Sequence, residues 1–163
     1  MDELELEKLR EASGLRLDKE GRFWHRGEPV EHERTISVLH RGIHRAPDGR
    51  WATRIGHEWG YLEVEDAALF VQQLSVADGS LRGQLLTGEW VEISELSHGA
   101  DDALYTRVRG ERARLSRPAQ ASLMPWLHEE AGTYFLDANG ARVAIGTDRG
   151  PEPQRDDPAK MRT

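Results

Sequence analysis

Alternation of apolar and polar residues predicts a chain built mainly of β-hairpins. Residues 15–30 alternate around a turn at Lys19–Gly21, which places Phe23 and Trp24 in the returning strand. Further hairpins are predicted at residues 51–64, at residues 104–115 and around Asn139-Gly140. Their turns are expected at residues 56–60, at Gly110-Glu111 and at Asn139-Gly140, because glycine and asparagine accept the backbone of tight turns.

Helical patterns occupy less of the chain. Residues 2–12 have the composition of a short polar helix that Gly14 closes. In residues 32–43, apolar residues recur at helical spacing, at Ile36, Leu39 and Ile43. We expect that face to be buried and the arginines and histidines of this helix to face water.

A third helix is predicted after the hairpin at residues 104–115. It begins at Arg117-Pro118 and runs to Leu127, and Pro125 kinks or ends it. Residues 64–74 fit either a strand or a helix.

The two central hairpins belong to an internal repeat. Residues 53–79 placed above residues 106–132 give seven identities in 27 positions without a gap, against roughly two expected by chance. The pairs are Thr53/Thr106, Arg54/Arg107, Glu58/Glu111, Leu62/Leu115, Ala68/Ala121, Leu74/Leu127 and Gly79/Gly132. Upstream of each copy lies a glycine turn, in KEGRFW and in LTGEWVEI.

This repeat predicts an α+β fold of two similar subdomains, each made of antiparallel hairpins or small sheets with one helix. The predicted organisation is a polar helix at residues 1–13, subdomains at 14–78 and 79–146, and a disordered tail at 147–163, where three prolines fall.

Composition narrows the setting and the partners. The chain has no cysteine, which removes disulfides and thiolate metal sites and favours a reducing cytoplasm. No apolar run approaches the roughly 18 residues of a membrane span, and the first residues are acidic, unlike a signal peptide. The net charge of −7 disfavours a DNA or RNA track and an anionic membrane.

One segment departs from this acidic balance. Residues 104–117 contain five arginines and the single acid Glu111. Strand alternation places Tyr105, Arg107, Arg109, Arg112 and Arg114 on one face, with Arg109 opposite Arg112 and Arg107 opposite Arg114 if the turn has two residues.

In the first copy the equivalent face carries Arg54, Trp59 and Tyr61. Guanidinium groups suit phosphates and aromatic rings suit bases, so this face predicts a nucleotide-like or other small anion as ligand. We expect Arg107 and Arg109 to contact its phosphate or carboxylate while Trp59 or Tyr105 stacks on a planar group. The alternative is a solvated face that is neutralised by acids such as Glu63, Glu65, Asp101 and Asp102.

Other candidate chemistry is sparse. Glu65 and Asp66 close a predicted strand and are suited to bind a hydroxyl, a metal or an arginine, or to cap the next element. His40 and His44 have the spacing of zinc ligands, but Arg41 stands where zinc peptidases carry glutamate. We therefore predict no metal and no cofactor, and the chain shows no motif of a catalytic site.

The order of its short motifs resembles the bacterial domain of unknown function 1285 family. The first half carries EGRFWH, GEPV and the VED of residues 64–66, and the second half carries Tyr105–Gly110 and Ala113 followed by Arg117-Pro118. The resemblance spans about residues 14–146. It implies an α+β fold with a duplicated core and a C-terminal half superficially like pleckstrin-homology domains. It also implies a suspected nucleotide-type ligand site between the halves and a suspected role in signalling. The implied interface residues are Trp24, Glu65, Asp66, Tyr105, Arg109 and Arg117.

These observations favour a binding protein over an enzyme. The first interpretation is a module that senses a nucleotide-like ligand or another small anion. The alternative is a protein-interaction module that uses the same hairpins to hold a protein partner. The duplication predicts a shared scaffold with unequal surfaces, on which the half-specific residues Trp59, Arg109 and Arg112 are the stronger functional candidates.

Overall fold

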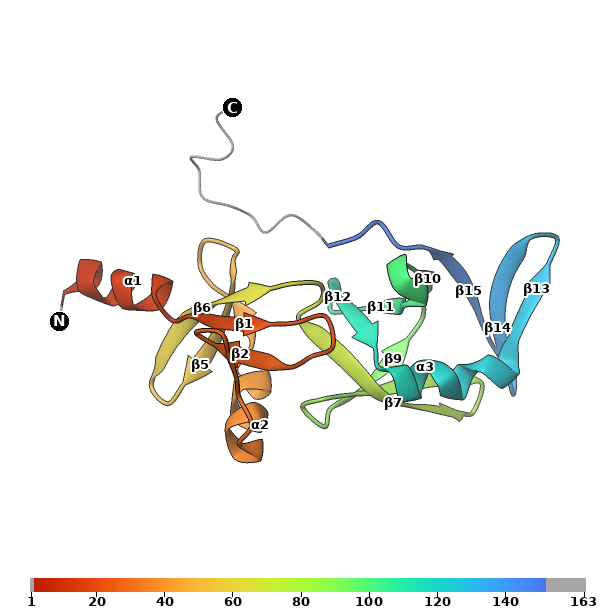
Figure 1. Cartoon of the computed structure of the whole chain (residues 1–163). Helices are drawn as coiled ribbons and strands as arrows, with labels where there is room; N and C mark the ends of the chain where they lie inside the picture. Colours follow the sequence, from red (N-terminus) through yellow and green to blue (C-terminus); the bar gives the residue numbers. More distant parts are fainter. Residues whose placement is uncertain (1, 152–163) are drawn as a thin grey trace, which may run out of the picture. The chain divides into compact units, whose positions relative to one another are not determined.

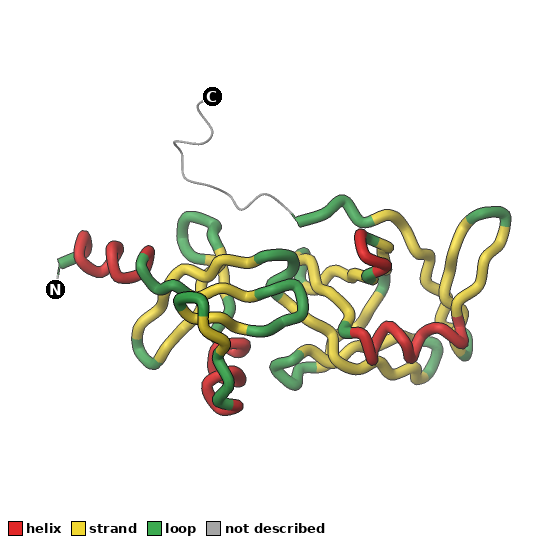
Figure 2. The backbone as a smooth tube through the Cα atoms, viewed as in Figure 1, coloured by secondary structure: helices red, strands yellow, loops and turns green. Residues whose placement is uncertain are grey.

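In the computed structural model of the chain, residues 2–151 are described, and strands predominate among them (Figures 1 and 2). These residues form two compact units that divide between Ala68 and Leu69. The predicted boundary between residues 78 and 79 falls instead in the turn of a hairpin, because the strand before it pairs with the second unit. None of the described helices is long and apolar enough to cross a membrane.

The first unit is a six-stranded sheet with two helices (Figure 1). Its strands lie in the order β3-β2-β1-β6-β5-β4, and β1 and β6 pair in parallel. Helix α2 packs against β5 and helix α1 against β6. The elements are α1 (Glu3–Glu11), β1 (Leu15–Leu17), β2 (Phe23–His25), β3 (Glu28–Pro29), α2 (Glu33–Arg41), β4 (His44–Arg45), β5 (Trp51–Ile55) and β6 (Glu58–Val64).

The predicted helices of this unit are confirmed, with one error of orientation. Asp2 caps α1 by accepting a hydrogen bond from the Glu5 amide, and Leu39 of α2 is buried as expected. His40 was expected to face water, but it is buried and its ring lies 4.6 Å from that of Phe23. Burial lowers the pKa of His40 to about 4, so the histidine is neutral at physiological pH.

The second unit is a nine-stranded sheet among the described residues, in the order β13-β14-β15-β10-β11-β12-β7-β8-β9. One cluster of buried residues, which includes Val71, Leu115 and Leu136, forms its core. Its elements are β7 (Leu69–Ala77), β8 (Ser80–Leu85), β9 (Trp90–Ile93), β10 (Leu96–His98), a 3₁₀ turn (Ala100–Asp102), β11 (Leu104–Val108), β12 (Glu111–Leu115), α3 (Arg117–Leu123), a 3₁₀ turn (Met124–Trp126), β13 (Leu127–Glu130), β14 (Thr133–Ala138) and β15 (Ala141–Thr147).

The structure answers two questions that the sequence raised for this unit. Residues 64–74, which fit either a strand or a helix, belong to strand β7 from Leu69 onward, and α3 ends before the 3₁₀ turn that contains Pro125. The predicted tail was to begin at residue 147, but Thr147 ends β15 and the next amide donates to the His98 carbonyl. Residues 152–163, where the rest of that predicted tail falls, lie outside the described residues.

The two units repeat one strand order, which confirms the α+β fold of two similar subdomains. The first six strands, β3-β2-β1-β6-β5-β4, correspond to β9-β8-β7-β12-β11-β10. In each unit a parallel pair lies at the centre of these six strands. It is β1 with β6 in the first unit and β7 with β12 in the second. These parallel pairs were not predicted, because hairpin signals report only on strands that are neighbours in the sequence.

The sequence repeat follows this structure only in part. Thr53 and Thr106 are equivalent buried residues, and each donates its hydroxyl hydrogen to a backbone carbonyl, of Leu39 and of Glu95 respectively. Leu62 and Leu115 are likewise equivalent and buried. After Leu62 and Leu115 the alignment is wrong, since residues 69–77 form the single strand β7 whereas the matched residues 122–130 form the end of α3, the 3₁₀ turn and β13.

The matched glycine turns are also not equivalent. KEGRFW joins β1 to β2, whereas LTGEWVEI joins β8 to β9. The counterpart of the second turn is Arg26-Gly27, between β2 and β3. Gly27 has a φ of 85° there, and Gly88 has a φ of 94° in the turn between β8 and β9.

Candidate ligand-binding groove

The arginine strip on β11 and β12 has a different register from the one predicted. Arg107 lies opposite Arg112 and Tyr105 opposite Arg114, because the two-residue turn is Arg109-Gly110 and not Gly110-Glu111. Arg109 has a φ of 50° and Gly110 a φ of 78°, the left-handed pair that a tight hairpin turn requires. Arg109 therefore lies in the turn and does not face Arg112.

Arg112 is part of the fold. Its guanidinium forms an ion pair with Asp148 at 2.7 Å, with 8% and 7% of the two side chains exposed, and stacks 3.8 Å from the Tyr105 ring centre. Tyr105 is buried and its hydroxyl accepts a hydrogen bond from Arg114. The prediction that Arg112 and Tyr105 present a surface to a ligand is corrected by this burial.

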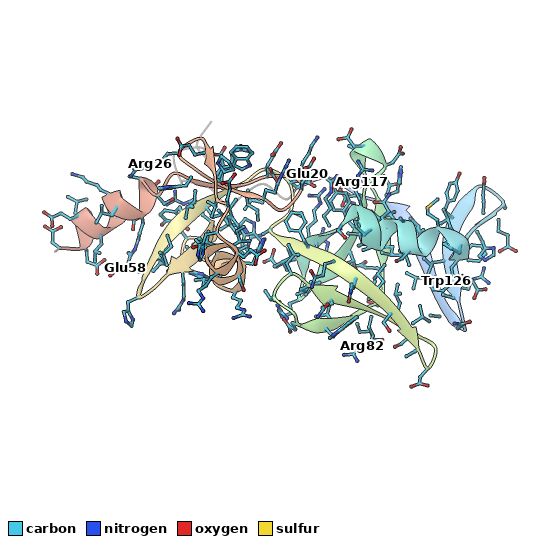
Figure 3. All side chains as sticks on the ribbon, turned by 60° about the horizontal axis from the view of Figure 1, so that its bottom comes forward. Glu20, Arg26, Glu58, Arg82, Arg117 and Trp126 are labelled. Atoms are coloured by element: carbon cyan, nitrogen blue, oxygen red, sulfur yellow. The ribbon has the colours of Figure 1, made fainter. Side chains whose placement is uncertain are left out.

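The remaining arginines of the strip lie nearer to water. Arg107 is half-buried and donates to the Gly110 carbonyl, and Arg109 forms an ion pair with Glu89 at 2.9 Å in which both side chains are exposed. Arg117 is exposed at the start of α3 (Figure 3). The acids paired with Arg112 and Arg109 are Asp148 and Glu89, which are not among the four acids suggested from the sequence.

In the first unit, Trp24 and Glu65 lie in one polar cluster at the end of β1. The Trp24 indole donates to Asp18, and Arg16 forms an ion pair with Glu65 at 3.3 Å. Burial favours a higher pKa for Asp18, but hydrogen bonds from Trp24 and from two backbone amides outweigh it and lower that pKa. Asp66 follows Glu65 and is half-buried, and no group of three potential metal ligands occurs in residues 2–151.

Arg54 and Trp59 lie opposite each other on β5 and β6. Arg54 is exposed. Trp59 is half-buried, with the Arg10 guanidinium 4.1 Å from its ring centre and Tyr61 stacked edge-on at 5.1 Å. Helix α1 packs against Trp59 and Tyr61. The sequence did not predict this contact, because the helix shows only a weak apolar face.

Polar contacts fix α1 on this face. Tyr61 donates its hydroxyl hydrogen to Glu7, and Arg50 donates to Glu11 at 2.7 Å. Burial, together with the hydrogen bonds to Glu7 and Asp48, raises the pKa of Tyr61 to about 12. Gly60 completes the fit, because a Cβ at that position would lie 2.9 Å from the Ser13 Cβ.

Beside this contact lies an apolar groove of about 680 Å³, lined by residues of the first unit. Its walls come from α1, α2, the first strands of the sheet and the end of the β5–β6 hairpin, where Glu58 lies (Figure 3). Its apolar lining includes Leu6, Leu9, Leu39, Ile55 and Trp59, and its polar lining consists of Arg10, Ser13, His25, Thr35 and Glu58. Leu9 and Ile55 are 59% and 52% exposed, so the groove is open and its rim is apolar.

Of the ten residues predicted to bind a ligand, Trp59 alone lines this groove. The groove depends on contacts between segments far apart in the chain, and no local motif signals it. The nearest sequence signal is the set of leucines in α1, none of which is fully buried.

The described chain is thus an α+β protein of two sheet units that repeat one strand order. Two crystal structures of DUF1285 family proteins share this fold. One, from Silicibacter pomeroyi DSS-3, is 19% identical with a TM-score of 0.64 over 82% of this chain and 80% of that chain. The other, from Shewanella baltica OS155, is 19% identical with a TM-score of 0.52 over 69% of this chain and 91% of that chain.

The similarity expected from the motif order is therefore confirmed at the level of the fold. No protein-family model matches the sequence, and no curated protein sequence matches it significantly.

Proposed function

We propose that the protein is a binding module that takes up a small molecule with an apolar body in the groove of the first unit. The observation that carries this proposal is the groove itself, which has a volume of about 680 Å³ and walls that are mainly leucine, isoleucine, valine and tryptophan side chains. Ligand sites typically have volumes of about 300–1,000 Å³ and such walls, with few polar groups.

Binding rather than catalysis also agrees with what the ionisable residues of this unit do. His40 is packed against Phe23, Asp18 holds the Trp24 indole, and Glu7 and Glu11 fix α1. Each of these groups is engaged in maintaining the fold. We place this binding in the cytoplasm, since a chain without cysteine suits a reducing compartment.

Two matched substitutions test the location of the site. Ile55 lines the groove and Val38 does not, yet both are exposed apolar residues, at 52% and 45%. We expect Ile55→Asp to weaken binding of the neutral apolar dye Nile red by about tenfold or more, because it places a charge in an apolar wall. Val38→Asp should leave the dye affinity unchanged. Dye fluorescence during titration of the full chain gives both affinities.

Both variants should remain folded, since exposed substitutions usually change stability by no more than about 0.5 kcal/mol. Equal dye affinities for the two variants, or a wild-type chain that fails to bind the dye, would argue against the groove as a binding site.

A nucleotide-like anion bound by Arg107 and Arg109 is the second candidate, because these two side chains stay on the surface of the β11–β12 hairpin. If it is correct, a nucleotide at millimolar concentration should raise the unfolding temperature of the wild type, and Arg107→Ala with Arg109→Ala should abolish that rise. The double variant should fold nearly as the wild type does, because the Arg109–Glu89 pair is exposed. A thermal-shift screen in which no nucleotide stabilises the wild type would exclude this candidate.

A further inference from the structure

We infer that the ligand of the groove is an amphipathic carboxylic acid, whose carboxylate binds Arg10 and whose apolar body lies along the groove. This inference rests on the proposed function, since it assigns the chemical class of the molecule bound at the same site. It is carried by the contacts of Arg10, by a comparison with Arg50, and by the distribution of charge on the groove walls.

Arg10 is a cation on an apolar wall with few partners of its own. Its guanidinium lies 4.1 Å from the Trp59 ring centre, and its Nε atom is buried without a hydrogen-bond partner among the described residues. The nearest carboxylate oxygen, on Glu7, is 3.7 Å from Nη1, which is beyond hydrogen-bond range. With 18% of its side chain exposed, Arg10 has lost most of its hydration without gaining a hydrogen-bonded anion.

Arg50 shows what a purely structural arginine looks like on the same sheet. Its guanidinium also stacks on an aromatic ring, 3.5 Å from the Tyr61 ring centre. Unlike Arg10, it donates to two carboxylates, on Asp48 and on Glu11, each at 2.7 Å. The two stacked arginines therefore differ in one respect. Arg50 has its anions supplied by the chain, whereas Arg10 has only the 3.7 Å ion pair with Glu7 among the described residues, which leaves its Nη donors for a ligand.

The rest of the groove selects the shape and orientation of that ligand. Leu6, Leu9 and Ile55 offer only apolar contacts and suit an alkyl or aryl body. The uncharged polar side chains Ser13 and Thr35, together with His25, complete the lining. Glu58, at the end of the β5–β6 hairpin, is the acidic residue of the wall and disfavours an anion near it. A single guanidinium matches the charge of one carboxylate, which it can bind through two parallel hydrogen bonds.

A pair of probes that differ only in the head group tests this inference. Octanoate and 1-octanol are titrated separately into the full-length protein, and affinities are read from tryptophan fluorescence or calorimetry. We expect the wild type to bind octanoate about tenfold more tightly than 1-octanol, the size of effect that a charged hydrogen bond gives. Arg10→Met keeps the apolar stem and should reduce the affinity for octanoate to that for 1-octanol, without changing the latter.

Two further variants serve as controls. Lys8→Met removes a cation from the exposed side of the same helix, away from the groove, and should keep the preference for octanoate. Arg10→Lys keeps the charge without the planar fork and should retain part of the preference, so it tests the inference even if Arg10→Met disturbs the stacking on Trp59.

The outcomes separate this inference from the function on which it rests. If the wild type binds octanoate and 1-octanol equally, or if Lys8→Met loses the preference as fully as Arg10→Met, the carboxylate inference is overturned while binding in the groove stands. Loss of all preference in Arg10→Lys also overturns it. If neither probe binds the wild type, the proposed function itself fails.

Discussion

Replacing Asp148 with alanine is expected to lower the free energy of unfolding of the second unit by about 3–5 kcal/mol, the usual loss when one partner of a buried ion pair is removed. Arg112 and Asp148 are joined at 2.7 Å and are both more than nine-tenths buried. Without the carboxylate, the Arg112 guanidinium stays in a site that excludes water. Urea unfolding followed by circular dichroism measures the change.

A matched exposed pair provides the control for this prediction. Arg109 and Glu89 form an ion pair of similar length, at 2.9 Å, but both side chains are exposed. Glu89→Ala should therefore change stability by less than about 1 kcal/mol. The joint replacement of Arg112 and Asp148 by methionine and leucine should cost less than Asp148→Ala, because no buried charge is left unpaired. If Asp148→Ala and Glu89→Ala cost the same, the Arg112–Asp148 pair does not stabilise the fold as described.

Lowering the pH from 7.5 to 4.5 is expected to destabilise the protein by about 2–3 kcal/mol through His40 alone. The pKa of this histidine is about 4 in the folded chain, against an ordinary value of 6.5, and each unit of difference corresponds to about 1.4 kcal/mol. At a pH between these two pKa values, His40 is protonated in the unfolded chain and neutral in the folded chain. The stabilisation is therefore complete above pH 6.5 and is lost as the pH falls toward 4.

The matched variant is His40→Gln, which is neutral at every pH. It should be less stable than the wild type at pH 7.5, because it gives up the packing of the ring against Phe23, but its stability should change less between pH 7.5 and 4.5. Measurements stop at pH 4.5. At more acid pH the carboxylate of Asp18, whose pKa is lowered in the fold, also loses its stabilising effect and would add to the change. A variant with the same pH dependence as the wild type would show that His40 is not the group responsible.

Local signals predicted the hairpins and helices well, since turns and caps are decided by neighbouring residues. Asn139-Gly140 and the proline near the start of α3 are examples. The register of the β11–β12 hairpin was missed by one residue, because Gly110 can occupy either the first or the second position of a two-residue turn. That single step moved Arg109 from the strand face into the turn.

The candidate site was much less predictable, because it depends on which segments pack together. Arg112 resembled a free cation in the sequence, and its partner Asp148 lies 36 residues further on, in what was expected to be a disordered tail. Arg10 lies in a helix whose composition indicated only exposure to water, yet its stacking on Trp59 places it on the groove wall. Neither relation has a local sequence pattern that would reveal it.

The most direct measurement is a two-dimensional NMR titration of the isotope-labelled full chain with octanoate. Binding in the groove predicts saturable shifts of the Trp59 indole and of the amides of Leu6, Leu9 and Ile55, while the amides of Arg107 and Arg109 stay in place. Saturable shifts confined to the β11–β12 hairpin, or no saturable shift at any residue of the first unit, would contradict it.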